Sequence, residues 1–145
     1  VLVLDNGIFG KGFADFVKMY GGEAVVFTSD YQNPIDINDL KEFLDKDSDF
    51  KYATVVHCDT PSGVLNDIAS ICPLLSDYGI LSVVDSVAGM FGEYVNVDDS
   101  KIDILRDITT QSPICRGCKI IHQLVVAIES DWYIRVCCTQ RDIEV

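Results

Sequence analysis

The residue best placed to do chemistry in this sequence is Asp85. It follows an apolar run at residues 80–84 and precedes mostly small residues at 86–89. Such a run is typical of an inner strand of a parallel sheet, and ligands of open α/β sheets bind at the carboxyl ends of these strands. An unpaired buried charge costs roughly several kcal/mol. The carboxylate therefore needs a cationic ligand or, alternatively, the backbone N–H groups of a turn that it caps.

Two other segments carry side chains suited to binding a ligand. Phe9 lies between two glycines in a predicted strand-to-helix loop, where an aromatic ring is poorly shielded unless it packs on a ligand. Residues 58–63 combine Asp59 with the hydroxyls of Thr60 and Ser62 at a second predicted strand-to-helix corner. Free N–H groups at such a corner bind an anion or a ligand hydroxyl, whereas the structural alternative is an ordinary helix N-cap by Ser62 or Thr60.

Hydrophobic periodicity predicts the strands and helices that position these side chains. Buried runs mark strands at 1–4, 23–27, 52–57 and 80–85, and apolar residues at helical spacing mark helices at 13–20, 36–44 and 68–75. Asp36 is the predicted N-cap of the second helix, the glycines at 21–22 end the first, and Phe13 and Phe16 are expected in the core. This alternating order predicts a three-layer α/β fold with a mostly parallel sheet, whose carboxyl edge gathers the candidate residues.

Composition excludes several classes of partner. The chain has 145 residues, a formal net charge of −12 and a pI near 4.3, which argues against binding to nucleic acid or to an anionic membrane. No apolar run reaches the roughly 18 residues that a membrane span needs. The isolated cysteines Cys58 and Cys72 indicate reduced thiols and a cytoplasmic protein. The opening residues 1–5 lack an initiator Met and a basic segment, so we expect a piece of a larger protein rather than a signal peptide.

Four segments, in this order and spacing, resemble a known family. They are Asn6-Gly7-Ile8-Phe9-Gly10, the run from His57 to Leu65, Val84-Asp85-Ser86-Val87-Ala88, and Lys101-Ile102-Asp103-Ile104. They are similar to successive signatures of class V, fold type I aminotransferases, which depend on pyridoxal 5′-phosphate (PLP). The branch that they resemble most is that of the alanine–glyoxylate and serine–pyruvate aminotransferases, with their purine-catabolic relatives. The resemblance covers residues 1–105, as part of the large domain of that fold.

The resemblance implies a role for individual residues. Asp85 matches the aspartate that pairs with the pyridinium nitrogen of PLP, which keeps the ring protonated as an electron sink. Val87 matches the residue under one face of the ring, and Phe9 stands where an aromatic residue, often Trp, stacks on the other face. Thr60 matches a hydroxyl residue near the ring, and Asp59 stands where Glu is usual.

The implied reaction transfers an amino group from a small amino acid, of the alanine or serine type, to a 2-oxo acid such as glyoxylate or pyruvate. In the family this reaction needs a lysine as Schiff-base partner and is carried out by homodimers. The family continues after residues 102–104 with a Ser-Gln-Lys segment, but this chain has no lysine there, and Lys119 comes several residues late. The Gly-rich loop for the cofactor phosphate also has no counterpart. We therefore assign no catalytic residue and expect the chain alone to be inactive.

The segment 106–145 does not match the family and is rich in cysteine. It holds a Cys-x-x-Cys pair, a histidine and two adjacent cysteines, at positions Cys115, Cys118, His122, Cys137 and Cys138. Two interpretations remain open: half-sites for zinc, or a shifted reading frame near codon 105, which the other two frames of the source DNA would reveal. The alternative function is accordingly a non-catalytic α/β fragment, a pseudoenzyme or interaction module with a zinc-binding tail, although no metal site is assigned.

Overall fold

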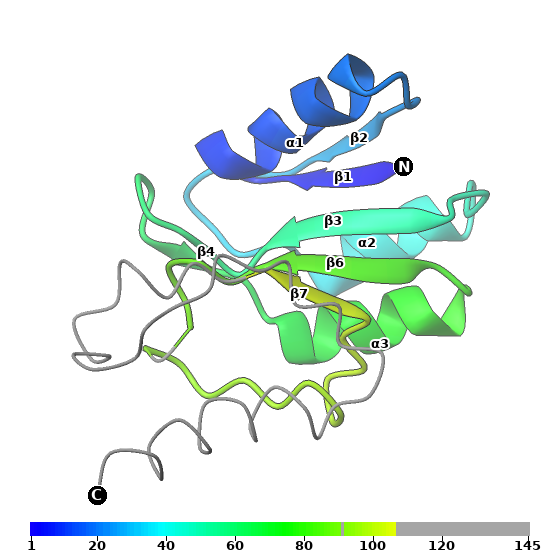
Figure 1. Ribbon diagram of the computed structural model, residues 1–145. Coiled ribbons are helices and arrows are strands. Elements are labelled where there is room, and N and C mark those ends of the chain that lie inside the picture. Colours follow the sequence, from blue (N-terminus) through cyan, green and yellow to red (C-terminus); the bar gives the residue numbers. More distant parts are fainter. Residues whose placement is uncertain (91, 107–145) are drawn as a thin grey trace, which may run out of the picture.

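The computed structural model describes residues 1–90 and 92–106, which form a parallel sheet, a small hairpin and three helices (Figure 1). In chain order the elements are β1 (Leu2–Asp5), α1 (Ile8–Met19), β2 (Val25–Thr28), α2 (Ile37–Leu44), β3 (Tyr52–Val56), β4 (Cys58–Asp59), β5 (Val64–Leu65), α3 (Ile68–Asp77), β6 (Leu81–Asp85) and β7 (Ile104–Arg106). None of these three helices is long and apolar enough to cross a bilayer.

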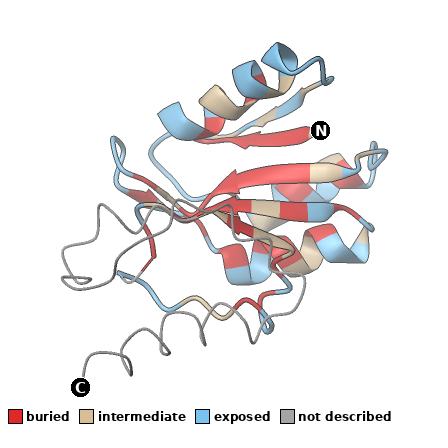
Figure 2. Ribbon diagram, in the orientation of Figure 1, coloured by how far each residue is buried: buried red, intermediate tan, exposed pale blue. Residues whose placement is uncertain are grey.

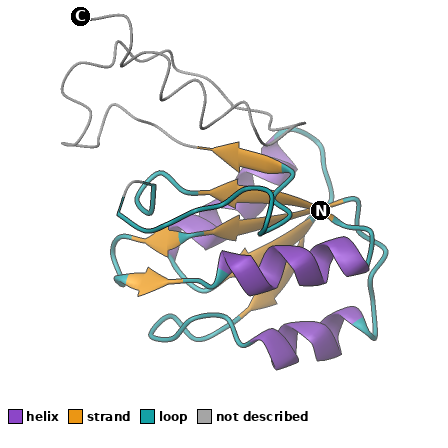
Figure 3. Cartoon of the chain, turned by 90° about the horizontal axis from the view of Figure 1, so that it is seen from below, coloured by secondary structure: helices purple, strands orange, loops and turns teal. Residues whose placement is uncertain are grey.

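The central sheet has five strands in the order β2-β1-β3-β6-β7. Every neighbouring pair is parallel, so the carboxyl ends of the strands lie at one edge. Figure 3, seen along a second direction, shows helices on both sides of the strands. The predicted three-layer α/β fold with a mostly parallel sheet is confirmed. The strand β7 was not predicted, because three residues are too short to show a period.

The hydrophobic core lies mainly between the sheet and the helices α2 and α3 (Figure 2). Its sheet residues alternate with residues of the opposite face, which is the pattern expected when both faces are covered. Leu4, Val55 and Val84 point into this core. Val3 and Val56 are also buried but lie outside that cluster, on the face that α1 covers. The alternation therefore assigns Asp5 and Asp85 to the face of α1.

Local signals set most helix ends. The Asp36 carboxylate accepts the N–H groups of Asn38 and Asp39, which confirms it as the N-cap of α2. Gly21, which follows the C-cap residue Tyr20, has a φ of 79°, a left-handed conformation that ends α1. The core prediction for Phe16 was wrong, because its side chain is 56% exposed on the outer face of α1.

The segment after β3 folds differently from the predicted strand-to-helix corner. Strands β4 and β5 pair in antiparallel fashion, so residues 60–63 form the turn of a hairpin. The helix α3 begins only afterwards, and its N-cap is Asp67, whose carboxylate accepts the N–H of Ser70. The N-cap prediction for Thr60 or Ser62 was therefore wrong. A Pro-Ser-Gly turn between two short strands is the local signal for the hairpin.

Candidate functional site

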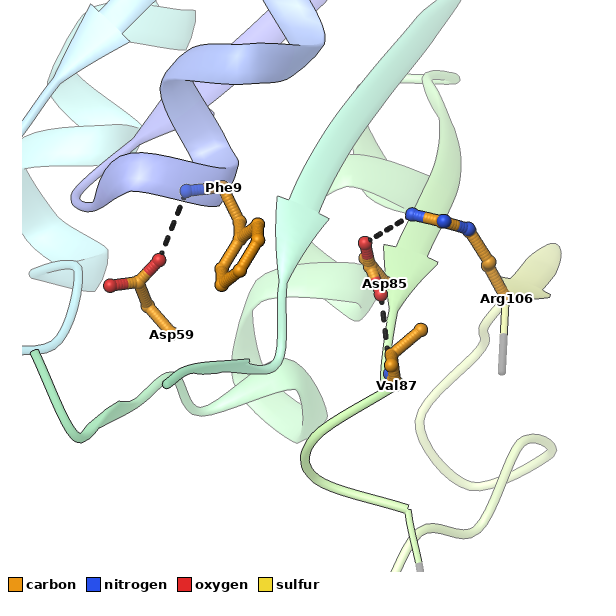
Figure 4. Close-up of polar contacts among 5 residues, drawn as sticks. All are labelled: Phe9, Asp59, Asp85, Val87 and Arg106. Atoms are coloured by element: carbon orange, nitrogen blue, oxygen red, sulfur yellow. Dashed lines mark hydrogen bonds and ion pairs between the residues drawn. The ribbon is translucent and has the colours of Figure 1, made fainter. Parts of the chain in front are cut away.

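Asp85 is the last residue of β6, and its carboxylate is held by two N–H donors (Figure 4). Oδ1 accepts the backbone N–H of Val87 at 3.2 Å, and Oδ2 accepts Nη1 of Arg106 at 2.7 Å. The Asp85 side chain is only 9% exposed. The need for a cation, inferred from the apolar strand, is thus satisfied in this chain by a guanidinium group from the neighbouring strand β7.

The other candidate residues lie at the same edge of the sheet. The backbone carbonyl of Asp85 accepts the N–H of His57 at 2.8 Å. Asp59, which lies two residues after His57, contacts the start of α1. There the Oδ1 atom of Asp59 accepts the N–H of Phe9 at 3.1 Å. Phe9 lies in the first turn of α1 rather than in a loop, and its side chain is 49% exposed. The structure therefore brings the starts of α1 and of the hairpin together beside β6.

Asp59 caps the helix α1 from outside the helix. The N-cap position of α1 is Gly7, which has no side chain, and the Asp59 carboxylate takes over that role. The same carboxylate accepts the N–H and the hydroxyl of Ser62, at 3.3 and 2.8 Å. Asp59 is buried, with 1% of its surface exposed. Because a carboxylate already occupies it, the positive end of α1 does not offer a site for a phosphate group.

Thr60 and Val87 differ in how they lie at this edge. Val87 is half-buried and directly follows the Asp85 turn, where its N–H fixes the carboxylate. Thr60 is exposed in the turn of the hairpin, next to Asp59. Sequence reasoning missed Arg106 and the capping role of Asp59. Neither carries a local signal, since each acts on a residue far away in the sequence.

A buried pair of side chains supports the Asp85 turn from within. Nδ1 of His57 lies 2.9 Å from Oγ of Ser86, and both residues are buried. A Cβ on Gly89 would lie 2.3 Å from Nδ1 of His57, so only glycine fits at that position. Burial lowers the pKa of His57 below its ordinary value of 6.5, against a weaker opposing attraction to Glu93. The ring is therefore held neutral near neutral pH.

The stability of the chain is expected to depend on pH through His57. As the pH falls below about 6.5, the unfolded chain takes up a proton on His57 that the folded chain binds more weakly, so the free energy of unfolding decreases. In the His57→Gln variant the free energy of unfolding should fall less steeply over this range. Urea unfolding of both proteins at about pH 7.5 and about pH 5.5 measures the difference. Equal slopes in the two proteins would contradict the assignment.

Gly7 is required by the close approach of Asp59. A Cβ at Gly7 would lie 2.4 Å from Cγ of Asp59, although the extended backbone there is open to any residue. We expect Gly7→Ala to displace the buried cap and to cost about 1–3 kcal/mol of unfolding free energy. The matched control is Gly12→Ala in the same helix, where nothing lies near the added methyl group and a gain of up to about 1 kcal/mol is expected. Chemical denaturation of both variants compares them, and equal losses would exclude the contact.

The amides of Asn6 and Asn66 tie the strand ends to the segments that follow them. Nδ2 of Asn6 donates to Oδ1 of Asn66 at 2.8 Å, and Nδ2 of Asn66 donates back to Oδ1 of Asn6 at 3.1 Å. Asn66 also accepts the N–H of Ile35 and donates to the carbonyl of Val56. Both residues are 1% exposed. This four-bond arrangement fixes the carboxyl edges of β1 and β3 relative to each other.

The chemistry of this edge of the sheet is that of a carboxylate that binds a cation. It offers one buried carboxylate that binds one charged donor and one backbone N–H, together with the half-exposed Phe9 on the neighbouring helix α1 (Figure 4). Within residues 1–90 and 92–106, no three potential ligand side chains gather in a way that could hold a metal ion. The predicted zinc half-sites at 115–138 lie outside the described residues.

The known proteins that are similar to this chain include aminotransferases. The solved structure of pyridoxamine–pyruvate aminotransferase from Mesorhizobium loti is similar with a TM-score of 0.69 and 32% identity, over 73% of this chain and 27% of that one. An uncharacterized aminotransferase of Methanocaldococcus jannaschii is 42% identical over 104 residues, and a 2-aminoethylphosphonate–pyruvate transaminase of Bacillus cereus is 30% identical over 105 residues. Both alignments cover 72% of this chain. They cover 27% of the Methanocaldococcus jannaschii protein and 30% of the Bacillus cereus protein.

The fold is that of the PLP-dependent transferases. Within it, the family model of class-V aminotransferases matches residues 13–106, and the chain belongs to this family. The resemblance described from the sequence is thus confirmed at the level of family, fold and the cofactor on which the family depends. The chain spans less than a third of the length of the relatives that it matches.

Proposed function

We propose that this chain forms the wall that binds the pyridine ring of PLP in an aminotransferase. The observation that carries the proposal is the buried carboxylate of Asp85 at the carboxyl end of an inner parallel strand, where it already binds a cationic N–H donor. A protonated pyridine nitrogen is a donor of the same kind, and a charge-assisted hydrogen bond in a buried site is stronger than an exposed one.

We assign each residue around Asp85 a proposed role toward the ring. Asp85 would accept the ring N–H, while Phe9 and Val87 would contact its two faces and keep water away from the carboxylate. Thr60 would supply a hydroxyl near the ring, from the turn beside Asp59. When bound, PLP supplies an electron sink that stabilises negative charge on the substrate carbon. The task of this chain is to keep the ring nitrogen protonated and the ring in place, and Asp85 performs the first part.

We propose a small amino acid of the alanine or serine type as amino donor and a 2-oxo acid, such as glyoxylate or pyruvate, as acceptor. Two relatives support the acceptor class, because the names of the Mesorhizobium loti and Bacillus cereus enzymes both contain pyruvate. The expected inactivity of the chain by itself rests on the absence of a lysine at the family's Schiff-base position.

We propose a homodimer for the intact protein and a cytoplasmic location. The dimer is supported by the resemblance to a family whose enzymes are homodimers. The location is supported by the thiols, because Cys58 and Cys72 are free in the part of the chain that the structure describes. The division into a large-domain part at 1–105 and a separate tail at 106–145 also remains a proposal.

Equilibrium dialysis of the chain against PLP tests the proposed function. We expect saturable binding of one PLP per chain, without turnover of alanine and glyoxylate. Pyridoxal, which lacks the phosphate, serves as the control. Any difference between its affinity and that of PLP measures the contribution of phosphate contacts in this chain. Failure of PLP to bind at all, together with stoichiometric zinc in a metal analysis, would replace this proposal with the interaction module.

A further inference from the structure

Arg106 is the residue at the candidate site that the proposed function does not use. It ends β7, directly opposite Asp85 in the register of the sheet, and its carbonyl accepts the N–H of Ser86 at 2.9 Å. Its backbone is therefore anchored at the edge. From there the guanidinium reaches Oδ2 of Asp85 at 2.7 Å (Figure 4).

The two partners of this ion pair have unequal surroundings. The Asp85 side chain is 9% exposed, whereas the Arg106 side chain is 42% exposed. A buried carboxylate without a cation is strongly disfavoured, but a guanidinium that is nearly half exposed regains water when it leaves. The Asp85 carboxylate thus requires a cation, while Arg106 is an exchangeable one.

The second oxygen of the carboxylate is also committed. Oδ1 accepts the N–H of Val87, so Oδ2 is the oxygen on which a charged donor is held. Two cations on one carboxylate divide its charge between them and repel each other. A protonated ring nitrogen would therefore meet Arg106 as a competitor.

We propose that Arg106 is an internal counter-ion of Asp85 that opposes the protonated pyridine nitrogen and so limits the affinity of the site for PLP. This inference rests on the proposed function. Arg106 is then a positioning residue that lowers the affinity for PLP. Removal of a purely structural ion pair would instead weaken PLP binding or leave it unchanged.

Cofactor binding to three variants and to the unsubstituted chain tests this proposal. Removal of a competing charge-assisted hydrogen bond should tighten PLP binding to Arg106→Gln by about tenfold. Lys101→Gln is the matched control, because Lys101 forms an exposed ion pair with Asp77 at 3.5 Å in the segment that leads into β7. Its affinity for PLP should equal that of the unsubstituted chain. Arg106→Lys retains the charge without the planar fork. Its affinity for pyridoxine 5′-phosphate, which has no aldehyde to react with the new amine, should fall between those of the unsubstituted chain and Arg106→Gln.

A carbocyclic analogue of the cofactor identifies the atom involved. In 1-deazapyridoxal 5′-phosphate a C–H replaces the ring nitrogen, so there is no cation for Arg106 to oppose. The gain in affinity of Arg106→Gln should therefore disappear with this probe. Should Arg106→Gln fail to fold by circular dichroism, the comparison of Arg106→Lys with the unsubstituted chain, with pyridoxine 5′-phosphate as the ligand, carries the test alone.

Three results would decide against the inference. An affinity for PLP that is unchanged or weaker in Arg106→Gln, and an affinity for pyridoxine 5′-phosphate that is unchanged or weaker in Arg106→Lys, assign the pair a structural role only. An equal gain with the deaza analogue shows that Arg106 acts on something other than the ring nitrogen. Absence of PLP binding in every form, including Arg106→Gln, overturns the proposed function itself and the inference with it.

Discussion

Replacing Asp85 by asparagine is expected to weaken PLP binding by roughly 10- to 100-fold, which is the value of one hydrogen bond to a charged group. The amide keeps the shape of the side chain but cannot neutralise a protonated ring. The fold should survive, because the Arg106 side chain that loses its partner is 42% exposed and can be hydrated. Equilibrium dialysis at neutral pH measures the affinity, and urea unfolding checks the stability.

Asp103→Asn is the matched control for this experiment. Asp103 also binds a neighbouring strand through its carboxylate, which accepts the N–H and the hydroxyl of Ser82 at 2.8 and 3.1 Å. It precedes β7 and so lies at the opposite end of the sheet. Its substitution should lower stability and leave PLP affinity unchanged. Equal losses of affinity in the Asp85 and Asp103 variants would show that binding does not depend on the carboxyl edge.

The second large effect is expected at Asn66. Truncation to alanine leaves the amide of Asn6, the N–H of Ile35 and the carbonyl of Val56 buried without the partners that Asn66 supplied. At about 1–3 kcal/mol for each unsatisfied group, partly relieved by relaxation, we expect a loss of roughly 3–5 kcal/mol. A domain of this size has only about 5–15 kcal/mol in total, so the variant should be largely unfolded in mild denaturant.

An exposed asparagine provides the comparison for Asn66. Asn38→Ala changes an exposed side chain in the first turn of α2, and its unfolding free energy should stay within about 0.5 kcal/mol of that of the unsubstituted chain. Denaturant midpoints followed by circular dichroism give both values. A loss below about 1 kcal/mol for Asn66→Ala would mean that water replaces the amide contacts.

The sequence predicted those parts of the fold whose cause is local. The strands that end at Asp5, Val56 and Asp85 are mostly apolar runs, because most of their residues are buried, and such runs are visible without any structure. The cap at Asp36 is equally local, since it binds N–H groups two and three residues away. A parallel sheet then follows from the alternation of strands and helices.

The details that the sequence did not predict depend on residues brought together by the fold. The bond from Phe9 to Asp59 joins residues 50 positions apart, and the bond from Arg106 to Asp85 joins residues 21 positions apart. No sequence pattern in either segment predicts its contact with the other. The hairpin at 58–65 was missed for a different reason, because hydroxyl residues near a Pro are as typical of a helix start as of a turn, and the true cap lies further on at Asp67.

The pairing of the strands also sets the order in which the chain can assemble. Leu2 pairs with Val25 on one side and Ala53 on the other, and Val83 pairs with Ile104. Among the described strands, only the β4–β5 hairpin joins close neighbours in sequence. Since closing long loops costs entropy before any contact forms, refolding should be slower than for a helical bundle of equal length. During synthesis β1, which is buried along its whole length, stays without its inner neighbour until β3 has left the ribosome.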